Sequence, residues 1–467
     1  MNRSFHWSTR TAAAAVAALS LGVLAACSSS STTSSPPAST GSSSAPAASS
    51  SAPAASSSAT STASAASATS ACGTNPGVKA TGTPINIGAI NTKQNGTDFS
   101  DIENMTGAYF ACVNDNGGIN GHPIKFFPVT EATNPSQIAA LSKQLITSDH
   151  VVGIAGSSSI IECTIDQGYW KSQGIFALGA GIAPECYSTP NTASVNMGPR
   201  YSSDGATSYV IAQGATKIAF DQSNVPGTDY IAAGPNAIAK AKNVPIQDFT
   251  ENVPITSAES VAQKLVSAAG PNGAVVLNFT PPQALLILQA AQKLNLEDRV
   301  KYWACSTPCN TDFLATALGP KWNNKLFVNA ELTPLDGNNS PTAQLFYAIL
   351  KQYGSNVSGG VGSFSEMGFV IGEIATHALE SITGPYTIAS VSAAFKAVSN
   401  YNTGLLCQGY TYGDYPEHLP NNMDYTVTPD NGKFVIASKG GGCTLISADD
   451  PQVAAYRQVA GTAPMAG

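Results

Sequence analysis

The sequence is poor in charged residues. Lys, Arg, Asp and Glu make up 11% of its 467 residues, and the net charge is −7. An average globular protein has about 25% charged residues. Binding to nucleic acid needs a basic face that neutralises phosphates. We therefore expect no nucleic-acid partner.

Histidine is scarce as well, which argues against catalysis and against a metal site. Beyond the first residues, the histidines are His122, His150, His377 and His418. No metal-site spacing joins them, and the chain has no Gly-x-Ser-x-Gly nucleophile elbow. Cys305-x-x-x-Cys309 is compatible with half of a zinc site, but no histidine lies near it. We expect no catalytic residue, metal or cofactor, and we keep an enzyme only as the least favoured alternative.

The chain also lacks a hydrophobic run that makes a convincing membrane span. Two arginines precede residues 11–26, an Ala/Leu/Val run typical of an export signal. Its end, Leu24-Ala25-Ala26-Cys27, resembles the lipobox of bacterial lipoproteins. That resemblance implies cleavage before Cys27 and acylation of this residue. We predict a lipoprotein signal peptide over residues 1–26, and an ordinary signal peptide is the alternative.

A low-complexity segment follows. Residues 27–71 consist almost wholly of Ser, Ala, Thr and Pro after the cysteine. Such a segment has no apolar periodicity with which to offset its ordering entropy, so we predict a disordered linker. Lipid chains on Cys27 would then tether an extracytoplasmic domain to the cell membrane.

The cysteine count fits this compartment. Nine cysteines less Cys27 leave eight, and an even number in an exported chain indicates disulfides. Many pairings are possible, and the sequence favours local ones. The expected pairs are Cys163–Cys186, Cys305–Cys309, Cys407–Cys443 and, by elimination, Cys72–Cys112.

Strand and helix patterns alternate through the first part of the folded region. The pattern predicts strands over residues 84–90, 124–129, 151–155 and 175–179, with helices over 100–114 and 135–148. Short connections in this order indicate a parallel, doubly wound sheet. After the strand at 151–155, the hydroxyl residues Ser157, Ser158 and Ser159 open a helix, whose N-terminus offers N–H groups to an anion. The alternative is that these serines only cap the helix.

A second series of the same kind begins near residue 217. It predicts strands over 217–221, 246–249, 273–279 and 300–305, with helices over 229–242, 258–269 and from 281. We expect residues 326–332 to cross back, feeding helices over 343–353 and 365–381, and residues 401–446 to return. The predicted first lobe is therefore 72–201 with 331–400, and the second lobe is 202–330 with 401–467. Three crossings would make a hinge beside a ligand cleft.

Motifs in the first lobe carry a family resemblance. They are Gly88-Ala89, Gly107-Ala108, Val113 to Gly121, Asn134-Pro135, Gly156 to Ser159 and Ala183-Pro184-Glu185. Together they resemble the branched-chain amino-acid-binding protein family, the solute-binding proteins of ATP-driven (ABC) importers. The resemblance implies the type I periplasmic-binding fold, a small-molecule solute and a membrane permease as partner.

The resemblance also implies site residues on the first lobe. The serine turn and the backbone of Ala180, Gly181 and Ile182 would hold a carboxylate of the solute. Ile182 departs from the family, which has a threonine there. Phe99 stands where relatives place an aromatic ring over the solute.

On the second lobe, the family pattern is broken. Relatives place one tyrosine in the turn that matches residues 224–227, around Pro226, another near Thr280, and an acidic residue near Thr307, and none of the three is present as expected. An ammonium group buried without an acidic partner loses a charge-assisted hydrogen bond of about 1.5–3 kcal/mol. A neutral polar solute or a carboxylate therefore fits better than a plain aliphatic amino acid.

Three other acidic residues could replace the missing partner. They are Asp221, Asp229 and Glu366, each of which is also compatible with a capping or solvated role. The expected function is that of a monomeric, lipid-anchored solute-binding protein of an ABC importer, for a small amino acid, amide or carboxylate. The alternative is a ligand-sensing receptor domain that signals to a partner protein, since one fold serves both uses.

Overall fold

The computed structural model describes residues 72–413 and 418–460. The predicted signal peptide, Cys27 and the linker lie outside the described residues. In the part of the chain that is described, no helix combines the length and the apolar character needed to cross a membrane.

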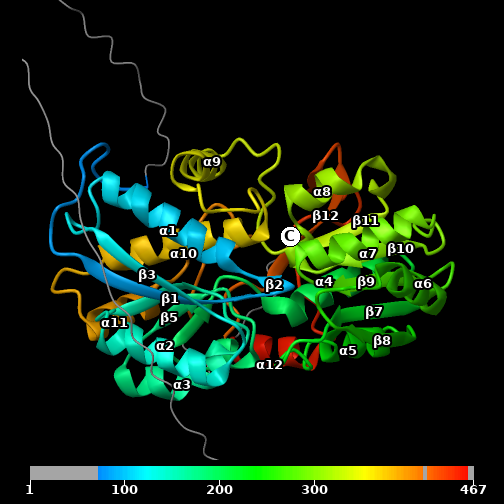
Figure 1. The fold of residues 1–467 in the computed structure, drawn as a ribbon, viewed down its shortest axis with the longest axis horizontal. Helices are drawn as coiled ribbons and strands as arrows, with labels where there is room; N and C mark the ends of the chain where they lie inside the picture. Colours follow the sequence, from blue (N-terminus) through cyan, green and yellow to red (C-terminus); the bar gives the residue numbers. More distant parts are fainter. Residues whose placement is uncertain (1–71, 414–417, 461–467) are drawn as a thin grey trace, which may run out of the picture. The chain divides into compact units, whose positions relative to one another are not determined.

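The first sheet is built from the strands that precede residue 195 (Figure 1). Its strands are β1 (Ile85–Gln94), β2 (Thr97–Asp98), β3 (Ile124–Glu131), β4 (Gly153–Ser157), β5 (Ala177–Gly179) and β6 (Thr192–Ser194). The order is β2-β1-β4-β5-β6, with β3 also paired to β1, and every pair except β1–β2 is parallel. All five residues of β4 are buried, as expected for a strand covered on both faces.

Helices cover both faces of the first sheet. They are α1 (Ser100–Asp115), α2 (Pro135–Thr147), α3 (Glu162–Gln173), α9 (Pro341–Tyr353), α10 (Ser363–Glu380) and α11 (Ile388–Ala397). Apolar side chains of α1 and α10 pack on one face, and those of α2 and α3 pack on the other (Figure 1). Two helices that are far apart in the sequence, α1 and α10, thus share one layer.

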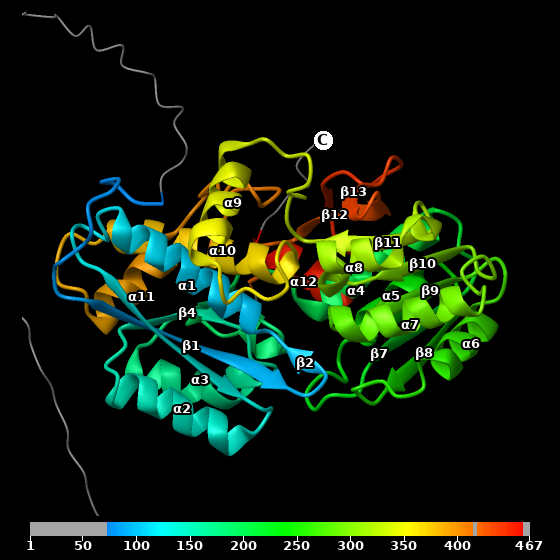
Figure 2. The same ribbon diagram turned by 45° about the horizontal axis from the view of Figure 1, so that its top comes forward.

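The second sheet contains the later strands. They are β7 (Ile218–Ser223), β8 (Ile246–Glu251), β9 (Ala274–Asn278), β10 (Tyr302–Cys305), β11 (Leu326–Ala330), β12 (Met423–Asp430), β13 (Lys433–Ile436) and β14 (Thr444–Leu445). The order is β13-β12-β11-β10-β9-β7-β8, with β14 on β12. Strands β7 to β11 are parallel, whereas β12, which Figure 2 shows beside β11, runs antiparallel to β11 and to β13.

The second sheet is also covered on both faces. Its helices are α4 (Gly198–Ala212), α5 (Ala233–Ala241), α6 (Ala258–Ala269), α7 (Pro281–Lys293) and α8 (Asp312–Leu318). Helices α6, α7 and α8 contribute to one apolar cluster and α4 contributes to another, while α5 contacts α4. The predicted mixed α/β architecture with two doubly wound, mostly parallel sheets is confirmed. We use "lobe" below for each sheet with the helices that cover it.

Two parts of the expected chain path differ from the structure. Residues 326–332 were expected to cross between lobes, but β11 stays in the second sheet between β10 and β12, and the crossing begins after Ala330. All five residues of β11 are buried, so this strand is a core strand and not a connector.

The other difference concerns the segment after residue 400, which was expected in the second lobe. Leu405, Leu406, Tyr410 and Tyr412 lie in the apolar cluster of the first lobe, and the ring of Tyr412 packs against Phe176 with centroids 5.1 Å apart. The chain therefore enters the second sheet only at β12. Burial of Tyr410 and Tyr412 in the first lobe determines this placement, whereas we expected these residues in the second lobe.

All four expected disulfides are present. They join Cys72–Cys112, Cys163–Cys186, Cys305–Cys309 and Cys407–Cys443. Each pair is at most 40 residues apart in the sequence, in agreement with the preference for local pairing.

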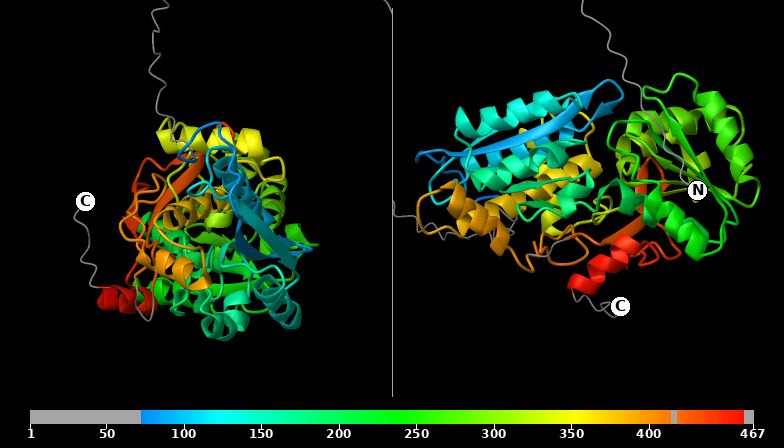
Figure 3. Two further views of the ribbon diagram at one scale, coloured as in Figure 1. Left: turned by 90° about the vertical axis from the view of Figure 1, so that its left-hand side faces the viewer. Right: turned by 90° about the horizontal axis from the view of Figure 1, so that it is seen from below.

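The C-terminal segment contacts both lobes. Asp450 forms a buried ion pair with Arg200 of α4 at 2.7 Å, and Asp449 pairs with Lys242 at the end of α5 at 2.8 Å. Helix α12 (Pro451–Ala460) places Val453 in an apolar cluster with first-lobe residues. The right-hand view in Figure 3 shows this helix, in red, beside the place where the two sheets meet.

Candidate ligand-binding site

A cleft lies between the two sheets, at the carboxyl ends of their strands. Open α/β sheets bind ligands in this position. The cleft holds about 720 Å³ of empty space, which includes solvent at its mouth. The first wall, as we name it, consists of Phe99, Ser158, Ile160, Ala180, Ile182 and Phe364. The second wall consists of Val225, Asn278, Phe279, Thr280, Pro308 and Glu331.

The three serines after β4 have different environments. The hydroxyl of Ser157 accepts a hydrogen bond from the backbone N–H of Ile90 at 2.9 Å, and that of Ser159 donates to Glu131 at 2.9 Å. Ser158 lies between them and lines the cleft. Two hydroxyls thus hold the turn in place, while the third faces the space that a solute could occupy.

The turn after β5 is rigid for steric reasons. The carbonyl of Gly181 accepts hydrogen bonds from the Tyr187 hydroxyl at 2.7 Å and from the Asn196 amide at 3.0 Å. A Cβ atom on Gly181 would lie 2.6 Å from the Cβ of Cys186, so no larger residue fits. Ala180 and Ile182 line the cleft on either side of this glycine.

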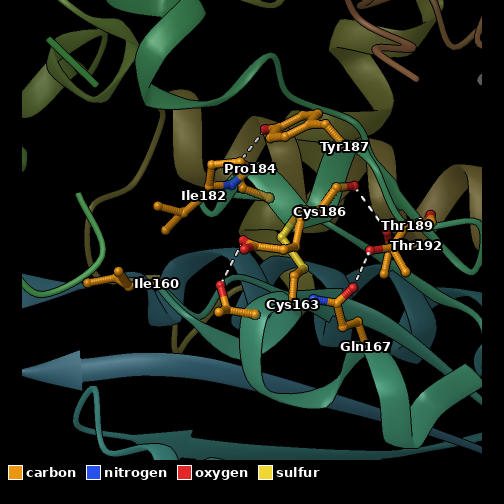
Figure 4. Close-up of a disulfide and its surroundings, with 12 residues drawn as sticks. Ile160, Cys163, Gln167, Ile182, Pro184, Cys186, Tyr187, Thr189 and Thr192 are labelled. Atoms are coloured by element: carbon orange, nitrogen blue, oxygen red, sulfur yellow. Dashed lines mark hydrogen bonds between the residues drawn. A yellow bond between two sulfur atoms is a disulfide. The ribbon is translucent and has the colours of Figure 1, made fainter. Parts of the chain in front are cut away.

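A disulfide anchors this part of the first wall (Figure 4). The Cys163–Cys186 bond joins α3 to the short helix η1 (Pro184–Tyr187), so it ties the helix after the serine turn to the turn after β5. Figure 4 shows Ile160 and Ile182 on the same side of this disulfide, where both line the cleft.

Phe99 also lies on the first wall, as expected. Its ring meets the edge of Phe364 with centroids 5.3 Å apart, and both rings line the cleft. Phe364 comes from the start of α10, more than 260 residues later in the chain. Nothing in the local sequence indicated this partner.

Of the expected second-lobe positions, only Thr280 lines the cleft. Its hydroxyl donates to the carbonyl of Gly96 in the first lobe at 3.0 Å. Pro226 and Thr307 are not among the lining residues, whereas their neighbours Val225 and Pro308 are. The Thr307 hydroxyl donates instead to Asn329 at 2.7 Å.

The sequence analysis missed Glu331, the acidic residue of the cleft. Its side chain is buried, and its Oε2 accepts the backbone N–H of Met197 at 2.7 Å. Burial raises its pKa to about 8, although the hydrogen bond from the Met197 N–H lowers it in part. Glu331 directly follows buried strand β11, and a polar residue at the carboxyl end of such a strand is a signal that could have found it.

The three acidic residues proposed as substitutes do not line the cleft. Asp221 is buried within β7, where burial raises its pKa to about 7, and Asp229 is exposed. Glu366 lies in α10, and burial followed by repulsion from Asp312 and Asp336 raises its pKa to about 8. The acidic side chain that does line the cleft is Glu331, which is none of these three.

Comparison with known families is decisive at this point. Residues 84–432 match the model of the family described as "Periplasmic binding protein". The chain belongs to this periplasmic binding protein family. The match confirms the family resemblance of the first-lobe motifs. No curated protein matches the chain.

Solved periplasmic binding proteins share the fold at low identity. A branched-chain amino-acid ABC transporter protein from Thermus thermophilus with bound valine has a TM-score of 0.68 at 14% identity, covering 80% of this chain and 99% of that one. A fatty acid ABC transporter substrate-binding protein from Thermomonospora curvata has a TM-score of 0.63 at 16% identity, covering 80% and 93%. A benzoate complex of a solute-binding protein from R. palustris has a TM-score of 0.63 at 16% identity, covering 79% and 99%.

The side chains that line the cleft of this periplasmic binding protein are suited to binding a small molecule. Just over half of the lining side chains are apolar, and hydroxyl and amide side chains and the carboxyl of Glu331 lie among them. Within the described residues, no group of three or more His, Cys, Asp or Glu side chains could hold a metal ion. The cleft therefore offers apolar contacts and hydrogen bonds to a solute.

Proposed function

We propose that this protein is the extracytoplasmic solute-binding component of an ABC importer. It closes its two lobes around one small solute and delivers that solute to a membrane permease. Membership of the periplasmic binding protein family supports the solute-binding role. The observation that carries the proposal is the cleft itself, whose two walls come from different sheets.

Contacts across the cleft support closure of the lobes. The Tyr230 hydroxyl, from the second lobe, donates to the carbonyl of Ile182 in the first, and Thr280 donates to Gly96. Val225 packs in one apolar cluster with Ile160 and Ile182 of the first wall. A solute that touches both walls adds to these contacts only when the lobes are together, so its binding favours the closed state.

The solute contacts that we propose follow from the lining of the cleft. On the first wall they are Ser158, the Ala180–Ile182 turn and Phe99. On the second wall, Thr280 is joined by Val225 and Pro308, which replace the expected Pro226 and Thr307. Ser157 and Ser159 act indirectly, since their hydroxyls hold the turn that presents Ser158.

We propose a solute with an apolar body and a small polar end. The mostly apolar lining supports this choice. The structural neighbours named for a fatty acid, benzoate and valine also handle solutes that are largely apolar. We further propose that the protein works as a monomer anchored by lipid chains on Cys27, which the lipobox-like sequence supports.

A thermal-shift screen tests this function. The purified protein is heated with amino acids, amides, small carboxylates, amines and aromatic compounds. A solute at one hundred times its Kd adds about 2.7 kcal/mol to the free energy of unfolding, which raises Tm measurably. If no compound of any class raises Tm, the solute-binding proposal loses its support.

One variant connects the screen to the first wall. Ser158→Ala is expected to reduce affinity for the best solute about tenfold, because it removes one hydrogen bond of about 1–1.5 kcal/mol. The matched control is Ser172→Ala, on the exposed side of α3, which should leave affinity unchanged. Equal affinities of the two variants would exclude Ser158 as a solute contact.

A further inference from the structure

The position of Glu331 makes it unusual among the acidic residues of this chain. Its side chain is 2% exposed, yet it lines the cleft. It lies where the chain leaves the second sheet after β11. A buried carboxyl at the end of a ligand cleft is therefore both shielded from water and within reach of a solute.

Glu331 also belongs to the hydrogen bonds that tie the lobe crossings together. Its Oε2 accepts the N–H of Met197, in the crossing between β6 and α4. Its backbone carbonyl accepts the Asn421 side-chain amide at 2.9 Å, in the crossing that leads to β12, and the same amide donates to Val195 at 3.2 Å. The carboxyl is thus fixed in position before a solute arrives.

The cleft contains an acidic side chain but no basic one among the described residues that line it. Among the described residues that line it, Glu331 is the single ionisable side chain, and none is Lys, Arg or His. A carboxylate next to Glu331 would bring two acidic groups together without a cation, and two such groups cannot both ionise in a buried site. An ammonium group there would instead gain a charge-assisted hydrogen bond.

The surroundings of the carboxyl agree with this preference. The ionisable groups that act on Glu331 are Asp424 of β12 and Tyr187 of η1, and neither carries a positive charge. Burial raises the Glu331 pKa to about 8, so a cationic partner is needed to favour its ionised form near neutral pH.

We propose that Glu331 determines the class of solute, so that the cleft takes an apolar molecule with a primary amine directed at this carboxyl and rejects a carboxylate at the same place. The assignment rests on the proposed solute-binding function. It distinguishes this chain from the structural neighbours named for a fatty acid and for benzoate.

A matched series of probes tests the assignment. Isothermal titration calorimetry of the purified protein compares 3-methylbutylamine, 3-methylbutan-1-ol and 3-methylbutanoate, and then 2-phenylethylamine, 2-phenylethanol and phenylacetate. Within each series the apolar body is nearly constant while the charge changes. We expect the amine to bind at least tenfold more tightly than the carboxylate in the series that fits the cleft.

Variants identify the residue responsible. Glu331→Gln should weaken amine binding about ten- to hundredfold, because hydrogen bonds to charged groups contribute about 1.5–3 kcal/mol, and should change alcohol binding far less. The matched control is Glu366→Gln, which alters another buried glutamate outside the cleft and should leave all affinities unchanged. If Glu331→Gln does not fold, Glu331→Asp keeps the charge and should retain the preference for amines.

The outcomes separate the two proposals. If carboxylates or alcohols bind at least as tightly as amines, the role of Glu331 is wrong and solute binding stands. An equal loss of amine affinity in both glutamine variants would also overturn the role of Glu331. If no probe binds and no compound of the wider screen raises Tm, the proposed function and the assignment both fail.

Discussion

The two walls of the cleft are built in different ways. The central part of the first wall, from Ser158 to Ile182, is formed by consecutive turns after β4 and β5, held by the Cys163–Cys186 disulfide and by hydroxyls of the serine turn, while Phe99 and Phe364 join it from the starts of α1 and α10. The second wall gathers residues from the ends of β7, β9, β10 and β11, over more than 100 residues of chain. It carries the ionisable group of the cleft, Glu331, and the first wall carries none within the described residues.

This difference indicates that the two walls have different roles in binding a solute. The part of the first wall that comes from one short stretch of chain, from Ser158 to Ile182, can be rigid and can offer the same hydrogen bonds to many solutes. A wall assembled from several strand ends can change one side chain at a time without disturbing a motif. Selectivity is therefore expected to lie mainly on the second wall, and shape mainly on the first.

At a fixed pH, the largest effect on stability is expected from removing the disulfide of the first wall. Cys163→Ala with Cys186→Ala opens a loop of 23 residues, which is expected to cost about 3 kcal/mol of the free energy of unfolding. The matched pair on the second wall, Cys305→Ala with Cys309→Ala, opens only 4 residues and should cost about 2 kcal/mol. Chemical denaturation measures both, and a larger loss for the second pair would contradict a first wall held by this disulfide.

Next in size is a change in the turn after β5. Gly181→Ala places a Cβ against Cys186 and Ser194, and overpacking of this kind costs about 1–3 kcal/mol. Gly168→Ala, in α3 of the same lobe, meets no atom within 4 Å and serves as the control. Thermal unfolding should show a lower Tm for the first variant only, and equal Tm values would mean that the first wall is less rigid than the packing indicates.

The pH dependence of stability tests the second wall. Native Glu331 keeps its proton up to about pH 8, whereas an unfolded glutamate loses it near 4.5, so the native state binds more protons between these values. Its contribution to stability is therefore full at low pH and falls as pH rises through this range, by at most about 1.4 kcal/mol per pH unit.

Glu331→Gln should flatten this dependence in thermal melts from pH 4.5 to 8.5. Glu366→Gln should flatten it to a similar degree, because burial raises that pKa to about 8 as well. Curves that run parallel to the wild type for both variants would show that neither carboxyl is held neutral. Only Glu331→Gln should also change the binding of amines.

The smallest effect concerns a bond between the lobes. Thr280→Val removes the hydrogen bond to Gly96 and should weaken lobe contact by about 1 kcal/mol. Thr216→Val removes a similar bond to Asn272 within the second lobe. Small-angle X-ray scattering should show an increased radius of gyration for the first variant alone, and no increase would mean that this bond does not hold the lobes together.

Features that depend on local contacts could be predicted from the sequence, and features that depend on distant contacts could not. The strands near 85, 124 and 153, the disulfides and the serine turn are local features, and the structure has them as predicted. The path after residue 400 was assigned to the wrong lobe, because Leu405 and Tyr410 are equally apolar in either core. Glu331 was missed since nothing near it in the chain marks it as part of a site.

The amino-acid pattern predicts the two α/β series, the disulfide pairs and the turn that presents Ser158, because periodicity, cysteine spacing and short connections act over a few residues to a few tens of residues. Which strand ends face each other across the cleft follows from the packing of the whole chain. The packing of the two lobes puts Glu331 on the wall of the cleft that faces the serine turn, and the packing of α10 brings Phe364 beside Phe99. Such meetings depend on how whole sheets pack and on where the chain crosses between them, and no local pattern encodes them.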